Sequence, residues 1–409
     1  MANELDWLKL KFQIASLFTP ASPINEKSLF ADRPVQVRKV LETISQRGQH
    51  AIIYGERGVG KTSLANVLSE FLSGIGKTVV ASRVAVTSSD SFADVWRRAF
   101  EQIKLSQEFD SMGFVPQSEK FIVSLAEKLP TNVTPDVVAR LLAEIGAHCL
   151  LVLVIDEFDR LSGKLDTRLV ADTIKSMSDI SVPATLVLVG VAESVNDLID
   201  GHESVLRNLV QIPMPRMNES ELRQIVLSRL PKLNMNIDDE ALNTIVELAR
   251  GLPHYVHLVG QHAAINACQS GSSTINQSHV FDAMTTSIDN AQQSLQSAYV
   301  SATTSPQKLN LYVQVLLACS LADADEFGYF AAADLRAPLK KVTGKDYEIP
   351  SFSRHLSAFS SESRQFILHL KGEKNQRRFR FKDPLMQPYV IMRGVRDGLI
   401  ELSSVNYKP

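Results

Sequence analysis

Short runs of leucine and β-branched residues alternate with amphipathic stretches along the first half of the chain. The expected strands are Ala51–Tyr54, Thr78–Val86, Leu150–Ile155 and Ala184–Val189. The expected helices around the first two are Pro34–Gln46, Lys61–Leu72 and Phe92–Ile103, in which apolar residues recur at helical spacing. Alternation of apolar strands with helices is typical of a parallel sheet covered on both faces. We therefore expect an α/β domain.

The pattern changes after Pro213, where the β-branched runs stop. Three helices are expected next, at Glu219–Leu230, Asp239–Arg250 and His254–Gln269. Asn218 offers the first of them an N-cap, and Glu221 completes a capping box. The stretch 287–308 is rich in Gln, Ser, Ala and Thr, which favours a helix that frays into a linker. A helical domain therefore follows the sheet domain.

The C-terminal part predicts a third module. Its expected elements are helices at Leu309–Leu321, Ala331–Lys341 and Ser351–Phe359, then strands at Phe366–Leu370 and Arg377–Phe381. At the other end of the chain, the prolines of FTPASPINEKSLF predict an extended lead-in up to about Phe30. The expected domains are a lead-in 1–27, an α/β core 28–215, a helical domain 216–286, a linker helix 287–308 and a C-terminal module 309–409.

Composition narrows the class of protein. The 409 residues are 44% hydrophobic and 22% charged, as in ordinary globular proteins, and the net charge of −2 means that any nucleic-acid contact needs a local basic patch. The cysteines Cys149, Cys268 and Cys319 form no CxxC, so no disulfide framework or zinc site is expected. The longest apolar run, Cys149–Ile155, is too short to span a bilayer, and the N-terminus does not resemble a signal peptide. We expect a cytoplasmic protein without membrane contact.

One segment carries a specific chemical signal. Between an expected strand and an expected helix, residues 55–62 match G-x-x-x-x-G-K-[ST] at every fixed position. Glycines let such a loop turn its N–H groups toward phosphate oxygens, and the helix adds its positive end. Lys61 would contact the β- and γ-phosphates, and the Thr62 hydroxyl would bind Mg²⁺. The expected nucleotide-binding residues of this loop are Gly55, Glu56, Arg57, Gly58, Val59, Gly60, Lys61, Thr62 and Ser63.

A second segment supplies paired acids. The buried run Leu151–Ile155 ends at Asp156 and Glu157. Asp156 at the strand tip can orient the shell of Mg²⁺, and Glu157 can polarise the water that attacks the γ-phosphate of ATP. The alternative for both acids is a helix cap after a core strand.

Together, GERGVGKTS and VLVIDEFDRL resemble the AAA+ ATPases of the origin-recognition and initiator branch, and the STAND signalling ATPases are also similar. The resemblance covers residues 28–256 and implies a P-loop core, a helical lid (216–286), ATP and Mg²⁺. SLFADRPVQVRKVL resembles a base-contacting box with Ala31 in place of glycine, which makes Arg33 an adenine-side residue or else an ordinary surface arginine. Arg207 falls where this family places an arginine that reaches a neighbour's nucleotide, implying an ATP-dependent homo-oligomer. A plain helix-end arginine is the alternative, and Arg216 is a weaker candidate for the trans role.

The chain departs from the initiator pattern at two sensor positions. Glu193 stands where a polar sensor is expected, so Ser194 or Asn196 would take over the sensing. His254 falls on the position of a sensor arginine, and the Gly-x-Pro that ends at Pro253 resembles the STAND switch, in which hydrolysis is slow. The resemblance therefore implies that Pro253 and His254 face the nucleotide, although His254 could equally cap a helix.

The C-terminal module resembles a winged helix. Its turn and flanks carry the basic residues Lys371, Lys374, Arg377, Arg378 and Arg380, which could neutralise DNA phosphates, and Arg354 and His355 could enter a major groove. The alternative is a nucleotide-state lever or a protein-docking surface. The leading hypothesis is a regulatory ATPase, nucleotide-switched and DNA-associated, similar to initiators or transposon target-selection ATPases. The rival is a STAND-like signalling or defence switch that recruits a separate protein effector.

Overall fold

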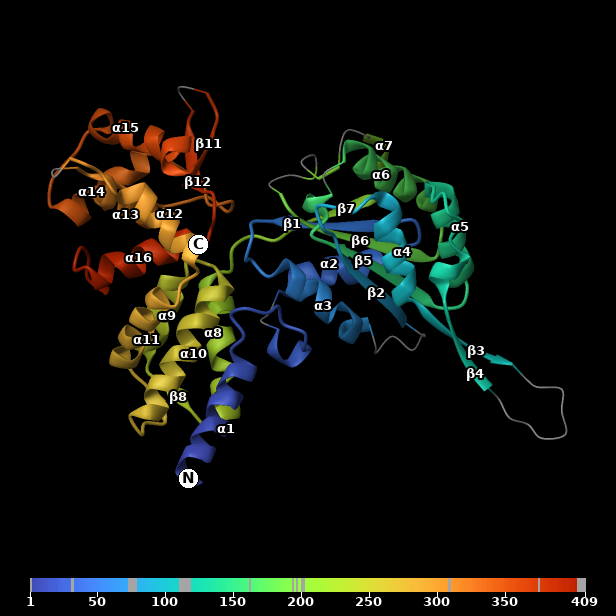
Figure 1. Ribbon diagram of the computed structural model, residues 1–409, viewed down its shortest axis with the longest axis horizontal. Coiled ribbons are helices and arrows are strands. Elements are labelled where there is room, and N and C mark those ends of the chain that lie inside the picture. The colour runs from blue at the N-terminus through green and yellow to red at the C-terminus, as the bar shows by residue number, and fades with distance from the viewer. Residues whose placement is uncertain are drawn as a thin grey trace.

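The computed structural model describes residues 2–30, 33–72, 79–109, 119–161, 163–192, 195, 198–199, 203–307, 310–373 and 376–402. Five residues singled out from the sequence lie outside these ranges: Ala31, Glu193, Ser194, Asn196 and Lys374. The protein has two lobes, one built around a sheet and one built of helices with a small sheet (Figure 1). Within the described ranges, no helix is both long enough and apolar enough to cross a bilayer.

A parallel sheet forms the centre of the first lobe, as the sequence predicts. Its strands are β1 (His50–Gly55), β2 (Val79–Ala85), β5 (Leu150–Asp156), β6 (Ala184–Val191) and β7 (Leu209–Pro213), in the spatial order β2-β5-β6-β1-β7. Side chains of β1 alternate between faces: Ile53 packs with the helices of one face and Ile52 with those of the other. Both faces are therefore buried.

Five helices cover this sheet. On one face lie α2 (Pro34–Ser45) and α3 (Lys61–Leu72), and on the other lie α4 (Phe92–Gln102), α5 (Pro135–Gly146) and α6 (Lys164–Asp179) (Figure 1). The edge strand β7 is the last core strand expected just after Arg207, whereas the sequence did not predict the short helix α7 (Glu203–Leu206) or the hairpin of β3 (Lys104–Phe109) and β4 (Glu119–Ser124). The strand β3 reads KLSQEF, which lacks a β-branched run, and the hairpin projects away from the core.

The lid is a bundle of α8 (Glu219–Leu227), α9 (Asp239–Ala249), α10 (Pro253–Gln269) and α11 (Gln277–Asp289), with the two-residue strands β8 (Asn236–Ile237) and β9 (Thr274–Ile275). The capping box is present: the Asn218 side chain accepts from Glu221 N, and the Glu221 carboxylate accepts from Asn218 N, both at 2.9 Å. The expected extended lead-in is wrong up to Leu17, because α1 (Ala2–Leu17) is a helix whose Ile14, together with Phe18, packs into the lid.

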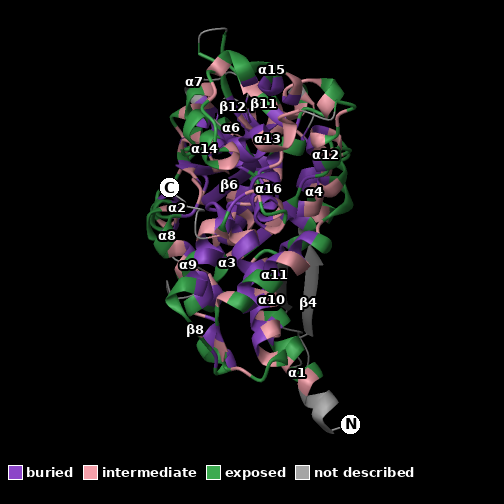
Figure 2. Ribbon diagram, turned by 90° about the vertical axis from the view of Figure 1, so that its left-hand side faces the viewer, coloured by how far each residue is buried: buried purple, intermediate pink, exposed green. Residues whose placement is uncertain are grey.

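The C-terminal module contains α12 (Gln293–Thr303), α13 (Tyr312–Leu321), β10 (Phe330–Ala331), α14 (Arg336–Thr343), α15 (Ile349–Phe359), β11 (Leu368–Lys371), β12 (Arg378–Phe381) and α16 (Met386–Arg396). Its antiparallel sheet has the order β10-β12-β11. The lid and this module share one hydrophobic core, in which α16 packs on α9 and α11. Figure 2 shows the buried positions running through both, with exposed residues at their outer surfaces.

Candidate nucleotide-binding site

The loop between β1 and α3 has the backbone of a phosphate cradle. Gly58 and Gly60 have φ angles of 87° and 97°, and Gly55 has a φ of 153°. A Cβ on Gly55 would lie 2.4 Å from the Met214 carbonyl oxygen, so only glycine fits there, whereas a Cβ on Gly60 would meet nothing within 4 Å. Among the described residues, the N–H groups of Gly58 and Gly60 donate no hydrogen bond. These donors remain open to an anion.

Lys61 lies within this loop. Its Nζ donates to the carbonyl oxygens of Gly55 at 3.0 Å and Glu56 at 2.8 Å. Burial lowers the pKa of Lys61 to about 8, and the carboxylates of Asp159, Asp156 and Glu56 oppose that shift. An anionic ligand would favour the charged ammonium further.

Asp156 ends the strand β5, where the sequence places it. Its side chain is 2% exposed; Oδ1 accepts from Glu157 N at 2.8 Å and Oδ2 from Arg83 Nη2 at 2.6 Å. Thr62 follows Lys61 in the first turn of α3 and is half-buried. A carboxylate and a hydroxyl are the hard oxygen ligands that Mg²⁺ takes when phosphates and waters complete its shell, so both residues fit that ion. In the part of the chain described, no cluster of three or more His, Cys, Asp or Glu side chains could hold a metal without a nucleotide.

Glu157 follows Asp156 in the left-handed conformation, with φ at 54°. The turn leaves its carboxylate 43% exposed, 3.3 Å from Arg160 Nη1. Two residues on, the Asp159 carboxylate accepts from Val191 N at 2.8 Å, which ties this turn to the end of β6. The acid predicted to activate water is thus accessible, on a turn fixed by Asp159.

Comparisons with known proteins agree with this geometry. Residues 44–199 match the family model of the AAA domain. This chain contains an AAA domain. Among solved structures, a Walker-type ATPase of Pyrococcus abyssi is similar, with a TM-score of 0.52 and 16% identity over 91% of this chain and 99% of the other. No curated protein matches the sequence.

Two further structures are similar over most of the chain. They are the ORC2 protein of Aeropyrum pernix (TM-score 0.49, 16% identity, 95% of this chain and 98% of the other) and Cdc6p from Pyrobaculum aerophilum (TM-score 0.46, 15% identity, 94% and 98%). The AAA+ P-loop fold that the sequence predicts is confirmed by the family model over residues 44–199 and by the Pyrococcus abyssi structure, whose likeness at 16% identity concerns the fold alone.

A buried junction connects the P-loop of the AAA domain to both other modules. Arg216, in the segment between β7 and α8, clamps the Glu56 carboxylate with contacts of 2.7 and 3.0 Å, and both side chains are less than a tenth exposed. The same guanidinium donates to Gln387 Oε1 in α16 at 2.6 Å, and Gln387 Nε2 donates to the Ser320 carbonyl oxygen at 2.9 Å. A cavity of about 470 Å³ adjoins this junction. Because Arg216 is buried in its own chain, the sequence-based suggestion that it reaches a neighbour is wrong.

Arg33 also lies at this junction. It is 1% exposed and donates to the carbonyl oxygens of Val59 in the loop at 3.1 Å and Pro215 at 2.9 Å. The alternative of an ordinary surface arginine is therefore wrong. Whether adenine lies against it stays a prediction.

The lid and the C-terminal module both touch the loop. A Cβ on Gly58 would meet Leu252 and Leu385 at 3.9 Å, and Tyr255 donates to the Leu385 carbonyl oxygen at 2.7 Å. Pro253 is the first residue of α10, and His254 Nδ1 donates to the Pro20 carbonyl oxygen at 2.8 Å. His254 thus binds the lead-in. The lead-in also contacts the start of α3, where the Ser63 hydroxyl accepts from Ile24 N at 3.1 Å. The Ser63 hydroxyl thus contacts the lead-in, and the binding of nucleotide by Ser63 stays a prediction.

The remaining predicted residues lie at the surface. Arg207 is exposed just after α7 and, among the residues described, forms no hydrogen bond or ion pair. The predicted wing is the turn between β11 and β12 with its flanking residues. There Arg377 is exposed, and Arg378 pairs with Asp325 at 2.6 Å. Arg380 and Lys371 lie 4.8 and 5.5 Å from the centre of the Tyr329 ring.

One prediction about the wing module is wrong. His355 is 1% exposed and packs edge-on against Tyr312, so it faces the core and not a groove of DNA, while Arg354 beside it is exposed.

Sequence reasoning missed Arg83, Asp159 and Gln387. Arg83 interrupts the apolar run of β2, which is a usable signal, and Asp159 belongs to the quoted VLVIDEFDRL segment. Gln387 carries no local signal, because only the packing of α16 brings it to Arg216.

Proposed function

We propose that this protein is a nucleotide-switched ATPase that binds ATP and Mg²⁺ between core and lid and transmits the nucleotide state to its C-terminal module. The observation that carries the proposal is the buried series Glu56, Arg216, Gln387, which joins the phosphate loop to α16. Any movement of the loop around a phosphate changes the position of Glu56. A buried ion pair loses much of its free energy when one partner moves away, so that movement reaches Gln387 through Arg216.

In this proposal, each loop residue has a defined role. The open N–H groups of Gly58 and Gly60 and the ammonium of Lys61 bind the phosphates, while Thr62 and Asp156 hold Mg²⁺. When bound, Mg²⁺ neutralises charge on the phosphate oxygens. Glu157, exposed on its turn, orients the attacking water. Arg33, Pro253 and His254 lie on the side of the base.

Glu157→Gln tests the enzymatic part. It should leave ATP affinity within about threefold of the parent and lower the rate of phosphate release by about 100-fold or more, because the amide cannot take up a proton. Phosphate release at the parental rate would remove Glu157 from the proposed mechanism.

Arg207 supports an assembly in which one chain completes the site of the next. Its guanidinium is exposed, as a residue acting across an interface must be, and its charge would stabilise the transferred phosphoryl group. The ATPase rate per chain should then rise with protein concentration in the parent and stay low in Arg207→Ala. A rate independent of concentration in both proteins would exclude the trans role.

We further propose that the wing binds duplex DNA. Arg377, Arg380 and Lys371 present positive charge from a two-stranded turn, and the exposed face of α15 carries Arg354. Fluorescence anisotropy with unrelated duplexes tests this: in the parent, log affinity should fall with log salt, and Arg377→Glu with Arg380→Glu should flatten that slope by about two units. Arg336→Glu, at an exposed arginine of α14 paired with Glu348, is the matched control.

The second candidate function is a STAND-like switch that recruits a protein effector. The observation that favours it is the position of Leu385 of the C-terminal module and Leu252 of the lid beside the loop, where a Cβ on Gly58 would meet both side chains at 3.9 Å. No binding of the parent to duplex DNA at low salt, with or without ATP, would exclude the DNA-associated function and leave this one.

A further inference from the structure

The carboxylate predicted to bind Mg²⁺ already has a cation beside it. Arg83 lies in the edge strand β2 two residues before Ala85, which pairs with Asp156 in the neighbouring strand β5. Residues two apart in a strand share a face, so Arg83 and Asp156 both point to the side covered by α3. Arg83 Nη2 lies 2.6 Å from Asp156 Oδ2, with the aspartate 2% and the arginine 37% exposed.

This contact leaves little room for a metal at the aspartate. Asp156 Oδ1 accepts from Glu157 N and Oδ2 accepts from Arg83, so each carboxylate oxygen has a donor. A buried carboxylate without a counter-ion is costly, which explains why an arginine accompanies it. Mg²⁺ and the guanidinium cannot both take the same position on Oδ2, because their charges repel and their shells overlap.

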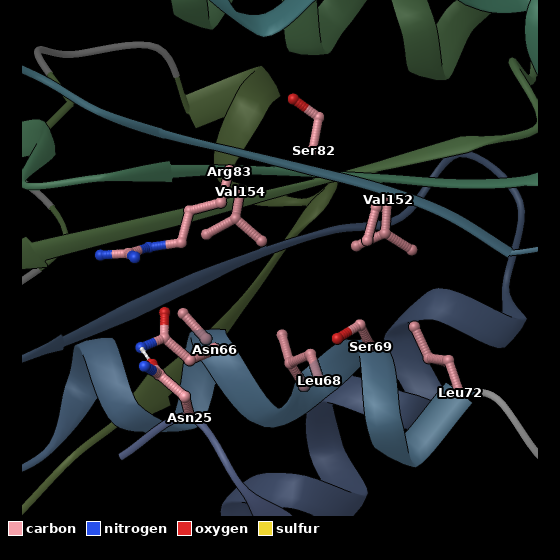
Figure 3. Close-up of a pocket in the computed structure, with 11 residues that line it drawn as sticks. Asn25, Asn66, Leu68, Ser69, Leu72, Ser82, Arg83, Val152 and Val154 are labelled. Carbon is pink, nitrogen blue, oxygen red and sulfur yellow. Dashed lines mark hydrogen bonds between the residues drawn. The ribbon is translucent and has the colours of Figure 1, made fainter. Parts of the chain in front are cut away.

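The structure also provides a place for the displaced guanidinium. A cavity of about 310 Å³ lies between α3 and the strands β2 and β5, and Arg83 lines it together with Asn25, Asn66 and Ser69. Figure 3 shows the Arg83 side chain reaching over the cavity, above the Asn66 and Asn25 amides, which are hydrogen-bonded to each other at 2.6 Å. In the described part of the chain, Arg83 Nε has no hydrogen-bond partner, so no bond at that atom holds the side chain against Asp156.

We propose that Arg83 is a positioning residue that neutralises Asp156 in the metal-free site and that Mg²⁺ must displace into this cavity. The proposal rests on the proposed binding of ATP and Mg²⁺. Mg²⁺ can then bind Asp156 only by breaking the Arg83–Asp156 pair. The free energy of that pair is therefore subtracted from the free energy of metal binding. Removing Arg83 should therefore strengthen the dependence of nucleotide binding on Mg²⁺.

The test measures the affinity for a fluorescent ATP analogue with excess EDTA and with saturating Mg²⁺, in the full chain. The affinity with Mg²⁺ divided by the affinity with EDTA reports the Mg²⁺ contribution. In Arg83→Ala this ratio should rise about fivefold, as expected for the loss of a partly exposed ion pair. Arg83→Lys, which keeps the charge but shortens the reach, should raise it about twofold and covers the case in which the alanine variant does not fold. Arg98→Ala is the matched control, since Arg98 is similarly exposed and pairs with Asp90 in the same domain.

The outcomes separate the inference from the function beneath it. A ratio that is raised in both Arg83 variants and unchanged in Arg98→Ala supports the displacement. An unchanged or lowered ratio in both Arg83 variants overturns it, because Arg83 would then be structural or a phosphate ligand. If the parent itself binds the analogue in neither condition, the proposed nucleotide function fails, and the inference with it.

Discussion

The phosphate loop and the junction beneath it differ in how they are built. The loop consists of consecutive residues, Gly55–Thr62, and among the described residues the N–H groups of its Gly58 and Gly60 donate no hydrogen bond. The junction joins Glu56 to Arg216, 160 positions away, and Arg216 to Gln387, 171 positions further, and these polar groups satisfy one another. The loop therefore offers free donors to a ligand, whereas the junction joins three parts of the chain through polar groups that are already paired. Substitutions in the loop should therefore weaken ligand binding, whereas substitutions in the junction should lower the free energy of unfolding.

Lys61→Ala should have the largest effect on ligand binding and should leave stability nearly unchanged. It removes the only loop ammonium facing the predicted phosphates, so we expect a loss of ATP affinity of about 100-fold or more, measured by fluorescence titration. Burial lowers the pKa of Lys61 to about 8, so burying the charged ammonium costs free energy, and this cost offsets the two hydrogen bonds that the substitution removes; the midpoint of thermal unfolding should stay close to the parental value. A variant that binds ATP like the parent would contradict the role of the loop.

Arg216→Ala should act on stability instead. It leaves the Glu56 carboxylate buried without its counter-ion, and breaking such a pair costs about 3–5 kcal/mol of unfolding free energy. Urea denaturation measures the loss. Arg223→Ala is the control, since the Glu219 partner of Arg223 is 61% exposed and such pairs contribute about 0–1 kcal/mol. Equal losses in the two variants would remove the distinction between junction and surface.

The same contrast explains what the sequence could predict. Residues 55–62 and the Asp156–Glu157 pair could be predicted because their functional groups are consecutive in the sequence and each set follows an apolar strand. The sheet could be predicted from the apolar runs. Arg33 donates to the backbone carbonyl oxygens of Val59 in the loop and of Pro215, and its place beside adenine stays a prediction. Gln387 and the burial of His355 depend on how α16 and α15 pack, which no local pattern encodes. Helix α1 has no marked apolar face, so helical periodicity gives no signal for it, and the prolines that follow it predict an extended segment.

Acid should weaken both lobes through buried histidines. Burial lowers the pKa of His50 in the sheet to about 4 and that of His257 in the lid to about 3, from 6.5. Both are neutral when folded, whereas the unfolded chain takes up protons below about pH 6.5. Stability is therefore complete above that pH and falls as the pH drops toward about 4, by up to about 1.4 kcal/mol per pH unit for each histidine. Urea unfolding at pH 7, 6 and 5 should give a shallower slope for His50→Gln than for the parent. Identical slopes would mean that His50 does not remain neutral.

The smallest expected effect is the energetic coupling between Glu56 and Gln387 through Arg216. Gln387→Ala removes hydrogen bonds to Arg216 and to the Ser320 carbonyl oxygen and should cost about 1–2 kcal/mol. Glu56 and Gln387 do not bond to each other; each bonds to Arg216. If Arg216 couples them energetically, a double-mutant cycle of Glu56→Gln with Gln387→Ala, measured by the free energy of unfolding, should show a coupling of about 0.5–1 kcal/mol.

The control for this cycle is Glu56→Gln combined with Gln277→Ala. Gln277 is a lid glutamine bonded to Thr244 and not to Arg216, so its effect should add to that of Glu56→Gln within about 0.5 kcal/mol. Measured again with saturating ATP and Mg²⁺, the Glu56–Gln387 coupling should change, because the phosphates reposition the loop that carries Glu56. A coupling that is the same with and without nucleotide would leave the junction as a static support and would remove the route by which the loop is proposed to control the C-terminal module.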